Sequence, residues 1–510
     1  MNRGCFCNVP AVLALLALAL GAGGATAQPA PTAAAATKEN PSSGALARDP
    51  RVVQALSLLS AWFDAEQAHR RLPGVSLAVV RDQELLYARG FGYAHVETKI
   101  PATPQTMYSI CSVSKLFTSV AVMQQRDAGK LRLDDPVAKL LPWFSIGGMP
   151  EGAPPVTVFG VLTHSSGLPR ESDFPYWTGP EYPFPPAEKL HERVPQQEML
   201  YRPETVFQYS NLGLALAGEV AAAAAGKPWA ELVRTGILDP LGMKDTETEH
   251  LDKYRGNRLA SGYTAPRRDG TREKVKAYEV RGIAPAAGMT STVEDLGRFA
   301  SWQFRLLGSG KTELLDVDTL REMQRVQFMD PDWKVSRGLG FQVWRSGEKT
   351  FVGHGGSCPG YRSHLLLQAQ EKLATVFMTN TSGVDAQKYA QTAYDLVAPA
   401  VKEALDDPKG AKAHVASFAR YAGRYDDAFA GEAHVFPWDD GLALVLLPAD
   451  RPLEALVKLK PVGEHLFRRI RDDGALGEGV RFEVDATGRG VRLWRHSNAL
   501  TRAADPPAAR

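Results

Sequence analysis

The sequence predicts an α+β protein: helices flank an antiparallel sheet, an all-helical subdomain is inserted, and a small all-β barrel or sandwich follows at the C-terminus. Three observations predict this class. Strand patterns occur at two distant places, 75–90 and 350–379, each beside helical patterns. Between them, from about 131 to 280, the strand signal fades and short helical patterns prevail. After residue 415, apolar and polar residues alternate, as half-buried strands require.

The bulk composition is that of an ordinary folded protein. The chain has 510 residues, more than one typical domain, and its formal net charge is +2 with acidic and basic residues intermixed. Nothing in this balance favours a nucleic-acid partner or a membrane surface. The small positive excess indicates ordinary solubility, and the oligomeric state stays open.

The N-terminus has the pattern of a secretory signal. Arg3 precedes an apolar run from Val9 to Leu20, and small residues end at Ala27. The run is too short to span a bilayer comfortably, and no later segment is a candidate membrane span. We expect residues 1–27 to be removed, 28–50 to be a disordered linker, and the protein to be exported, either periplasmic or secreted.

The first folded elements are a helix and a hairpin. Apolar residues recur at helical spacing over 51–71, and Pro73-Gly74 ends that helix. The stretches 75–80 and 85–90 are two strands joined by a polar turn. A helix over 112–128 follows, apolar on several faces, which is typical of a central buried helix.

The inserted helical part contains a loop rich in proline and aromatic residues, at 173–186. Proline removes backbone donors, so this loop is neither a helix nor a central strand. It is either a lid or binding edge, or a surface loop packed by its own aromatic residues.

Helices are expected over 294–307 and 316–326, with 308–312 as the turn between them. That turn reads Gly-Ser-Gly-Lys-Thr but is not a phosphate loop, because the required earlier glycine is Arg305 and no strand precedes it.

Three strands and a helix complete the sheet. The strands are 350–354, 361–368 and 373–379, and the helix is 385–405. One catalytic domain would thus span 51–405, with the helical subdomain at about 131–280. A linker at 406–414 leads to an accessory all-β domain at 415–505, which could shape the cleft, bind a partner or only pack.

The stretch with the clearest chemistry is Ser112-Val113-Ser114-Lys115. Residues three apart share one face of a helix, so Ser112 and Lys115 can share a proton. A serine hydroxyl needs such a neighbour to become a nucleophile. The pattern is common by chance, and a second copy, Ser346 with Lys349, lies in an expected surface turn.

Two later motifs fit the first. In Tyr209-Ser210-Asn211, a phenol that can relay a proton stands two residues from an amide that can hold a carbonyl. In the stretch from Gly353 to Gly360, around His354 and Gly356, glycines let a substrate backbone approach the strand edge.

The three ordered motifs resemble the serine hydrolases of the class C β-lactamase and DD-peptidase type. The resemblance spans about residues 50–405 and includes the segments 162–169 and 287–296, which look like that family's connecting segments. It implies an antiparallel sheet flanked by helices with an all-helical subdomain, which agrees with the pattern-based layout.

The resemblance also implies roles for individual residues. Ser112 would be the acylated nucleophile, Lys115 its proton acceptor and Tyr209 a general acid and base. Asn211 would anchor the substrate, and the backbone N–H groups of Ser112 and Ser357 would form the oxyanion hole. For Lys115 to accept a proton, burial or nearby positive charge must lower its pKa.

The chain departs from the β-lactamases proper at the strand where they carry Lys-Thr-Gly or Lys-Ser-Gly. Here the strand reads His354-Gly355-Gly356, so the cation and hydroxyl that bind a substrate carboxylate are missing. Loss of a charged hydrogen bond costs about 1.5–3 kcal/mol. We therefore expect hydrolysis of an ester, amide or D-amino-acid peptide bond. The alternatives are a β-lactamase or DD-carboxypeptidase, or a penicillin- or peptide-binding protein that acylates with little turnover.

The remaining reactive residues are expected to be structural or stay open. Cys5 and Cys7 precede the apolar run and would leave with the signal. Cys111 and Cys358 could form a disulfide in an exported protein or stay as reduced buried residues. His164 lies in a polar loop without a Gly-x-Ser-x-Gly elbow, so we expect a structural role. No zinc-type spacing is present, and neither metal nor cofactor is expected.

Overall fold

Strands from both ends of the catalytic part meet in one antiparallel sheet. The computed structural model describes residues 44–411, 415–429 and 431–504, and within them this sheet has nine strands in the order β3-β2-β1-β11-β10-β9-β8-β7-β6. The central pair joins the two chain ends: β1 pairs with β11 in a register that sets Val75 opposite Thr379. The strands are β1 (Gly74–Arg81), β2 (Glu84–His95), β3 (Ile100–Pro101), β6 (Phe328–Met329), β7 (Ser336–Arg337), β8 (Gln342–Ser346), β9 (Lys349–Cys358), β10 (Tyr361–Gln368) and β11 (Leu373–Thr379).

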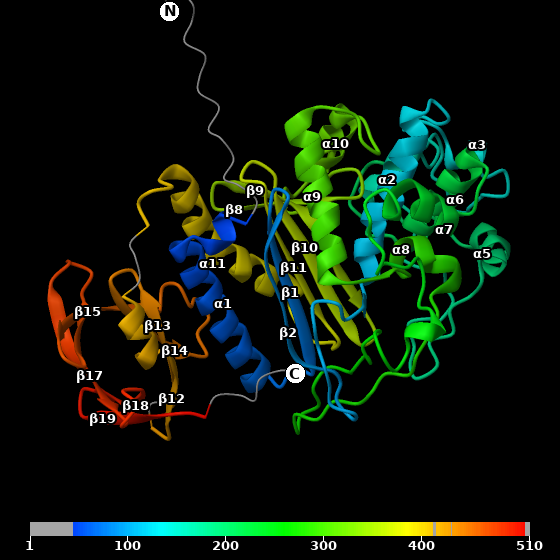
Figure 1. Cartoon of the computed structure of the whole chain (residues 1–510). Helices are drawn as coiled ribbons and strands as arrows, with labels where there is room; N and C mark the ends of the chain where they lie inside the picture. Colours follow the sequence, from blue (N-terminus) through cyan, green and yellow to red (C-terminus); the bar gives the residue numbers. More distant parts are fainter. Residues whose placement is uncertain (1–43, 412–414, 430, 505–510) are drawn as a thin grey trace, which may run out of the picture. The chain divides into compact units, whose positions relative to one another are not determined.

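Helices cover both faces of the sheet (Figure 1). On one face lie α1 (Pro50–His69) and α11 (Ala386–Asp406), and α9 (Val293–Ser309) packs on the other. The alternation of strand side chains supplies both faces, because successive residues point to opposite sides. In β11, Phe377 packs with the α1 and α11 residues, whereas its neighbours Val376 and Met378 pack on the α9 side.

The helix starts are fixed by side chains that accept backbone N–H groups. Asp49 accepts from Arg51 N before α1, Thr292 from Asp295 N before α9, and Asp385 from Lys388 N before α11.

The central helix is α2 (Ser114–Asp127), which lies on the α9 side of the sheet and contacts α6 and α8. Its apolar residues Leu116, Phe117, Val120 and Ala121 are fully buried, which confirms the expected central position. The other elements of this side are β4 (Tyr108–Ser109), α3 (Val137–Leu140), α4 (Val158–Thr163), α5 (Ala187–Arg193), α6 (Asn211–Ala225), α7 (Trp229–Val233), α8 (Ala284–Ala287), β5 (Thr290–Ser291) and α10 (Val317–Gln324).

The C-terminal part is a barrel, which decides between the two architectures expected from the sequence. In the described residues eight strands close on themselves, with β12 paired to both β13 and β19. The strands are β12 (Gly423–Asp427), β13 (Gly431–Trp438), β14 (Gly441–Leu447), β15 (Val457–Gly463), β16 (Leu466–Ile470), β17 (Leu476–Val484), β18 (Gly490–Arg495) and β19 (Asn498–Arg502). Alternate residues such as Leu444 and Phe482 fill its interior.

The barrel packs on α1 and α11. Trp62 Nε1 donates a hydrogen bond to Ala449 O at 2.8 Å, and Lys388 Nζ lies 2.9 Å from an oxygen of Asp450. The outward-facing Val445 and Leu447 of β14 belong to the same apolar cluster as α1. The described contacts therefore pack the barrel against α1 and α11.

The α+β class is confirmed, and several local expectations change. The expected linker 28–50 is described only from residue 44, where Leu46–Arg48 forms a 3-10 turn and Leu46 is buried against the α1 cluster. Disorder is thus wrong for residues 44–50. The expected strand 350–354 is longer, because β9 runs to Cys358, and α9 continues to Ser309 before Gly310 ends it in a left-handed conformation.

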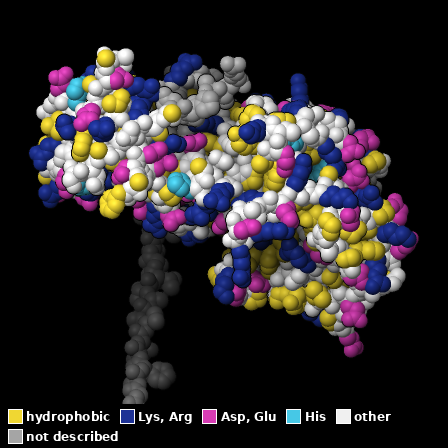
Figure 2. All heavy atoms as spheres, turned by 90° about the horizontal axis from the view of Figure 1, so that it is seen from below, with side chains coloured by type: hydrophobic (Ala, Val, Ile, Leu, Met, Phe, Trp, Pro, Cys, Tyr) yellow, Lys and Arg dark blue, Asp and Glu magenta, His cyan; other side chains and the backbone are white. Residues whose placement is uncertain are grey.

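The strands β6, β7 and β8 have no counterpart in the sequence prediction, because two to five residues are too few to show a strand pattern. The expected signal peptide lies outside the described residues. Within the described residues, no helix is long and apolar enough to cross a membrane. On the face shown in Figure 2, Lys and Arg side chains alternate with Asp and Glu, as the near-zero net charge suggests.

Candidate active site

The nucleophile candidate lies on a tight turn just before the central helix. Cys111–Val113 forms a 3-10 turn and α2 begins at Ser114, so the expected α-helix from Ser112 starts two residues later. Ser112 is buried, with 9% of its surface exposed. Lys115 Nζ lies 3.0 Å from Ser112 Oγ, which brings together the two residues that the sequence paired.

Lys115 is fully buried and held by three oxygen atoms. Besides Ser112 Oγ, its Nζ contacts Asn211 Oδ1 at 2.7 Å and the carbonyl oxygen of Ala286 at 2.8 Å. Both of these oxygens can only accept hydrogen bonds. A neutral amine has two hydrogens and one lone pair, so donation to both carbonyls leaves the lone pair directed at Ser112.

Burial holds the pKa of Lys115 well below its usual value. The nearby Arg170 lowers the pKa further, whereas Glu171 acts in the opposite direction. The environment of Lys115 therefore favours the unprotonated form that a base requires.

Tyr209 lies over the same cluster. Its ring centroid is 4.9 Å from Lys115 Nζ and 4.8 Å from the guanidinium carbon of Arg170. Burial raises the pKa of Tyr209 to about 12, and interaction with the Ser112 hydroxyl lowers it partly again. The phenol thus carries its proton in the neutral range and can donate it.

Asn211 is the first residue of α6, and its side chain is engaged on both sides. Its Oδ1 accepts from Lys115, and its Nδ2 donates to Glu171 Oε1 at 2.5 Å. The preceding Ser210 caps the helix by accepting from Gly213 N at 2.8 Å and donates to Pro169 O at 2.7 Å. The local capping chemistry therefore sets the position of the Asn211 amide.

His164 supports this segment rather than the reaction. It ends α4 in a left-handed conformation, and its Nδ1 accepts from Ser210 N at 3.1 Å. Its ring stacks on Tyr209 with centroids 4.3 Å apart. These contacts agree with the structural role expected from the sequence.

The aromatic loop 173–186 is packed rather than open. Tyr176 and Phe184 are buried, with ring centroids 5.0 Å apart, and Phe184 stacks on Tyr278. The Tyr176 hydroxyl donates to Glu171, which ties this loop to Asn211. The sequence left two alternatives open for this loop. The structure shows a loop that is packed by its own aromatic residues.

The strand candidates lie on the second half of β9, beyond its pairing with β8, which ends at Gly353. His354 is buried, its Nδ1 is 2.6 Å from Gly355 O, and its ring centroid is 6.2 Å from that of Tyr209. Burial, together with Lys115 and Arg337, lowers the pKa of His354 well below its usual value. His354 is therefore neutral and supplies no charge.

Gly356 and Ser357 occupy different surroundings. A Cβ atom on Gly356 would lie 2.2 Å from the carbonyl oxygen of Ile110, so this glycine is needed where the nucleophile turn approaches β9. The sequence suggested that a substrate backbone approaches this glycine. In the structure, the protein's own backbone at Ile110 makes that approach. The side chain of Ser357 is exposed.

The two remaining cysteines form a disulfide. Cys111 and Cys358 are bonded across 247 positions with a Cα–Cα distance of 5.7 Å, which is in the usual range. This decides between the two states that the sequence left open.

Three charged residues of the site were not foreseen. Arg170 and Glu171 directly follow the segment 162–169, which the sequence had marked, so their position was a usable signal. Arg337 of β7 lies with its guanidinium carbon 4.6 Å from the ring of Phe207, and its charge acts on Tyr209 and His354. Burial lowers the pKa of Arg337 to about 10, so it is a cation at neutral pH. No sequence pattern pointed to it.

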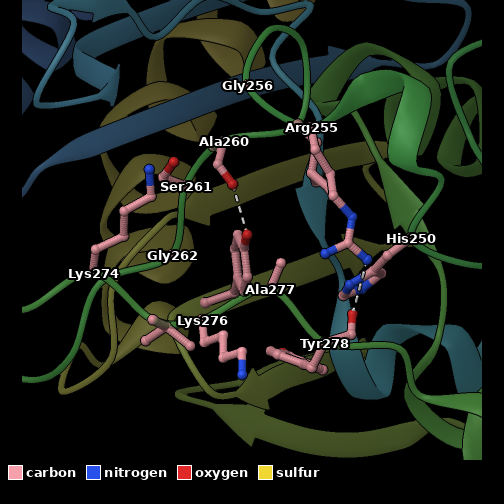
Figure 3. A pocket seen from close by; sticks show the side chains of 13 residues that line it. His250, Arg255, Gly256, Ala260, Ser261, Gly262, Lys274, Lys276, Ala277 and Tyr278 are labelled. Atoms are coloured by element: carbon pink, nitrogen blue, oxygen red, sulfur yellow. Dashed lines mark hydrogen bonds between the residues drawn. The ribbon is translucent and has the colours of Figure 1, made fainter. Parts of the chain in front are cut away.

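A separate cavity of about 180 Å³ is lined by residues between His250 and Tyr278 and by Tyr361 at the start of β10, and none of the expected site residues lines it. Figure 3 shows His250 and Arg255 directed toward each other at one side of it and Lys274 at the opposite side. The Tyr278 hydroxyl at its wall donates to Pro359 O at 3.1 Å. In the described part of the chain, no group of three or more His, Cys, Asp or Glu side chains could hold a metal ion.

The chain is similar to several known proteins over most of its catalytic part. The model of the Beta-lactamase family matches residues 59–399. Penicillin-binding protein 4 of Amycolatopsis lactamdurans is 26% identical over 327 residues, 62% of this chain and 83% of that protein. The D-aminopeptidase of Gluconobacter oxydans is 28% identical over 346 residues, 65% of this chain and 58% of that enzyme. The chain thus spans less than two thirds of the length of the second relative.

Among solved structures, the octameric penicillin-binding protein homologue from Pyrococcus abyssi has the same fold. It superposes with a TM-score of 0.58 at 24% identity, covering 88% of this chain and 100% of that one.

Proposed function

The chain belongs to the Beta-lactamase family, and from this membership we propose that it is an exported serine hydrolase that cleaves ester, amide or D-amino-acid peptide bonds. The reaction proceeds through an acyl-enzyme on Ser112. The observation that carries the proposal is the arrangement around Lys115 Nζ, where two carbonyl acceptors orient a buried amine toward Ser112 Oγ at 3.0 Å.

The first half-reaction uses these groups in order. Unprotonated Lys115 accepts the Ser112 proton as Oγ attacks the substrate carbonyl. The backbone N–H groups of Ser112 and Ser357 stabilise the oxyanion. Protonated Tyr209 gives its proton to the leaving group, and the bond from the carbonyl carbon to that group breaks. Water then hydrolyses the acyl-enzyme by the reverse proton transfers.

The neutral His354 supports substrates without a carboxylate at this strand. A buried, uncharged imidazole replaces the lysine of the β-lactamases and cannot form an ion pair. Asn211 is the proposed substrate anchor through its remaining amide hydrogen, although its described contacts hold Lys115 and Glu171. Gly356 contributes by admitting the turn beside β9.

Arg337 favours a second candidate, a β-lactamase or DD-carboxypeptidase. Its positive charge acts on Tyr209 and His354, so a cation from β7 is available to a substrate carboxylate. The sequence argument considered only the strand of His354 and therefore missed this charge.

One panel separates the two candidates. The same enzyme preparation is tested with a short-chain p-nitrophenyl ester, D-alanyl amides, D-amino-acid peptides with amidated or free C-termini, and a chromogenic cephalosporin. We expect kcat/KM for the ester and amides to exceed that for the cephalosporin. We also expect Ser112→Ala to abolish hydrolysis of every substrate in the panel. A higher value for the free carboxylates, lost in Arg337→Gln, would establish the second candidate.

Turnover distinguishes either enzyme from a binding protein that only acylates. A fluorophosphonate labels Ser112 in every case, so labelling alone decides nothing. We expect product well beyond one equivalent per protein molecule. A burst limited to one equivalent, without further release, would contradict the hydrolase.

Export is supported by the N-terminal pattern of residues 1–27. Mass spectrometry of the protein from a bacterial periplasm or culture medium should give a mature N-terminus at Gln28. Retention of the full N-terminus in the cytoplasm would contradict export.

A further inference from the structure

We propose that the Cys111–Cys358 disulfide is a positioning element of the oxyanion hole, which makes hydrolysis depend on its oxidised state. It would hold the backbone N–H groups of Ser112 and Ser357 at their working separation. The inference rests on the proposed function, because only an acyl-transfer reaction uses these two donors together.

The first argument is the position of the two sulfur atoms. Cys111 directly precedes Ser112 in the nucleophile turn, and Cys358 directly follows Ser357 at the end of β9. The bond therefore links the neighbours of both proposed donors, although they are far apart in the sequence. Any separation of the turn from β9 changes the distance between the donors.

The second argument is the backbone conformation of Cys111. Its φ is +49°, in the left-handed region that non-glycine residues rarely adopt. Such a conformation persists only where the surroundings hold it. Because the next residue is Ser112, this conformation also sets the direction of the nucleophile.

The third argument concerns the other contacts between the turn around Cys111 and the end of β9. These contacts oppose a separation of the two segments only weakly. The carbonyl oxygen of Ile110 leaves no room for a Cβ on Gly356, so the two segments already lie at a separation that only glycine permits. Against separation, Ser363 Oγ donates to Ile110 O at 2.9 Å. The Ser109 hydroxyl also lies 3.3 Å from Cys358 Sγ. These are neutral hydrogen bonds, and the disulfide is the covalent restraint beside them.

The redox step is balanced with dithiothreitol as the reductant. One thiolate of dithiothreitol attacks a protein sulfur and breaks the S–S bond, forming a mixed disulfide. The second thiol of the reagent resolves it. Two electrons and two protons pass to Cys111 and Cys358, and the reagent leaves as its cyclic disulfide.

The test compares oxidised, reduced and reoxidised full-length protein in p-nitrophenyl ester hydrolysis. Alkylation and mass spectrometry measure the redox state, and near-ultraviolet circular dichroism follows the fold. We expect reduction to lower kcat about 10–100-fold with KM within about threefold, because the oxyanion forms only after binding. The pH profile should keep its shape, since Lys115 and Tyr209 stay in place. Reoxidation with oxidised glutathione should restore kcat.

Two variants give the same comparison without reductant. Cys111→Ala/Cys358→Ala should have the low kcat and be insensitive to dithiothreitol, which excludes effects through other groups. Cys111→Gly/Cys358→Ala should recover at least threefold in kcat over that variant, because glycine adopts the left-handed conformation freely. Equal kcat in the two variants would refute the role of the Cys111 conformation.

The outcomes separate the failure of this inference from the failure of the proposed function. Unchanged kcat in the folded reduced protein or in the Ala/Ala variant, with only a lower Tm, would show that the disulfide stabilises the fold and nothing more. Hydrolysis that survives Ser112→Ala in the oxidised protein would instead refute the acyl-enzyme on Ser112, whatever the disulfide does.

Discussion

The described hydrogen bonds of Lys115 Nζ go to a hydroxyl and two carbonyl oxygens, and no carboxylate is among them. Glu171 is linked to the amine only through the side-chain amide of Asn211, whose Nδ2 donates to Glu171. A direct ion pair would favour the charged amine and oppose its use as a base. At the scale of residues, the Asn211 amide orients Lys115 without forming such a pair.

Lys115→Arg tests whether the site needs a base or only a positive charge. Arginine keeps its proton in proteins, so we expect at least a 100-fold loss of kcat and slow fluorophosphonate labelling of Ser112. The matched control is Lys349→Arg in the second Ser-x-x-Lys copy, where Lys349 is half-buried and pairs with Glu371. Full activity in Lys115→Arg would remove Lys115 from the base role and leave Tyr209.

The neighbouring charges should shift the pH profile in opposite directions. Activity rises with pH as Lys115 loses its proton, so the acid limb of kcat/KM follows its pKa. Glu171 raises that pKa and Arg170 lowers it. Glu171→Gln should therefore move the acid limb to lower pH, and Arg170→Gln to higher pH.

The readout is the position of the limb rather than the maximal rate, because Glu171 also contacts Tyr176 and Asn211. Limbs that move in the same direction in both variants would contradict the assignment of the limb to Lys115.

At the scale of elements, three short segments converge on Ser112. The turn before α2 brings the proposed nucleophile, the start of α6 brings Asn211, and the half of β9 beyond its pairing with β8 brings the proposed oxyanion donor Ser357. Each is fixed near its end: the turn by the disulfide, α6 by the Ser210 cap, and β9 by the approach of Ile110 to Gly356. Small changes at these ends should affect catalysis more than stability.

Ser210→Ala tests this for α6. Loss of the cap to Gly213 N should lower the free energy of unfolding by about 1 kcal/mol. The lost bond to Pro169 O also frees Tyr209 and Asn211, so we expect kcat to fall about 10–100-fold. Thermal unfolding and ester hydrolysis measure the two effects.

Asp385→Ala is the matched control. It removes the cap of α11, on the opposite face of the sheet from Ser112, where Asp385 accepts from Lys388 N at 3.0 Å. It should lose similar stability and keep full kcat. Equal losses of kcat in both variants would show that capping acts only through global stability.

At the scale of the whole molecule, the sheet separates the site from the barrel. Val113 packs in the apolar cluster on the α9 side, whereas Phe436 and Leu447 of the barrel pack in the cluster of α1 and α11. The described contacts of the barrel therefore support the side of the sheet that does not carry the nucleophile.

Trp62→Phe tests the consequence. It removes the hydrogen bond to Ala449 O and should lower the free energy of unfolding by about 1 kcal/mol more than Trp344→Phe. Among the described residues, Trp344 Nε1 has no partner to lose. We expect kcat of Trp62→Phe to stay within twofold of the native value. A large loss of kcat without a change in KM would indicate that the barrel contact reaches the site.

The sequence by itself determined the elements and the order of the motifs. Helical spacing placed α1, α2 and α11, and short apolar runs marked β1, β10 and β11, because the side-chain pattern is a local property. The pairing of Ser112 with Lys115 followed from the same periodicity, even though a 3-10 turn replaces the expected first helical turn. Tyr209, Asn211 and His354 followed as parts of an ordered pattern.

The tertiary structure decided what depends on contacts between distant segments. It paired β1 with β11, closed the C-terminal strands into a barrel and joined Cys111 to Cys358. It also brought the positive charge of Arg337 near His354, which no sequence pattern indicated. The physical reason is that electrostatic environment and covalent pairing depend on distance in space, which the packing of the sheet and its helices sets and local sequence does not.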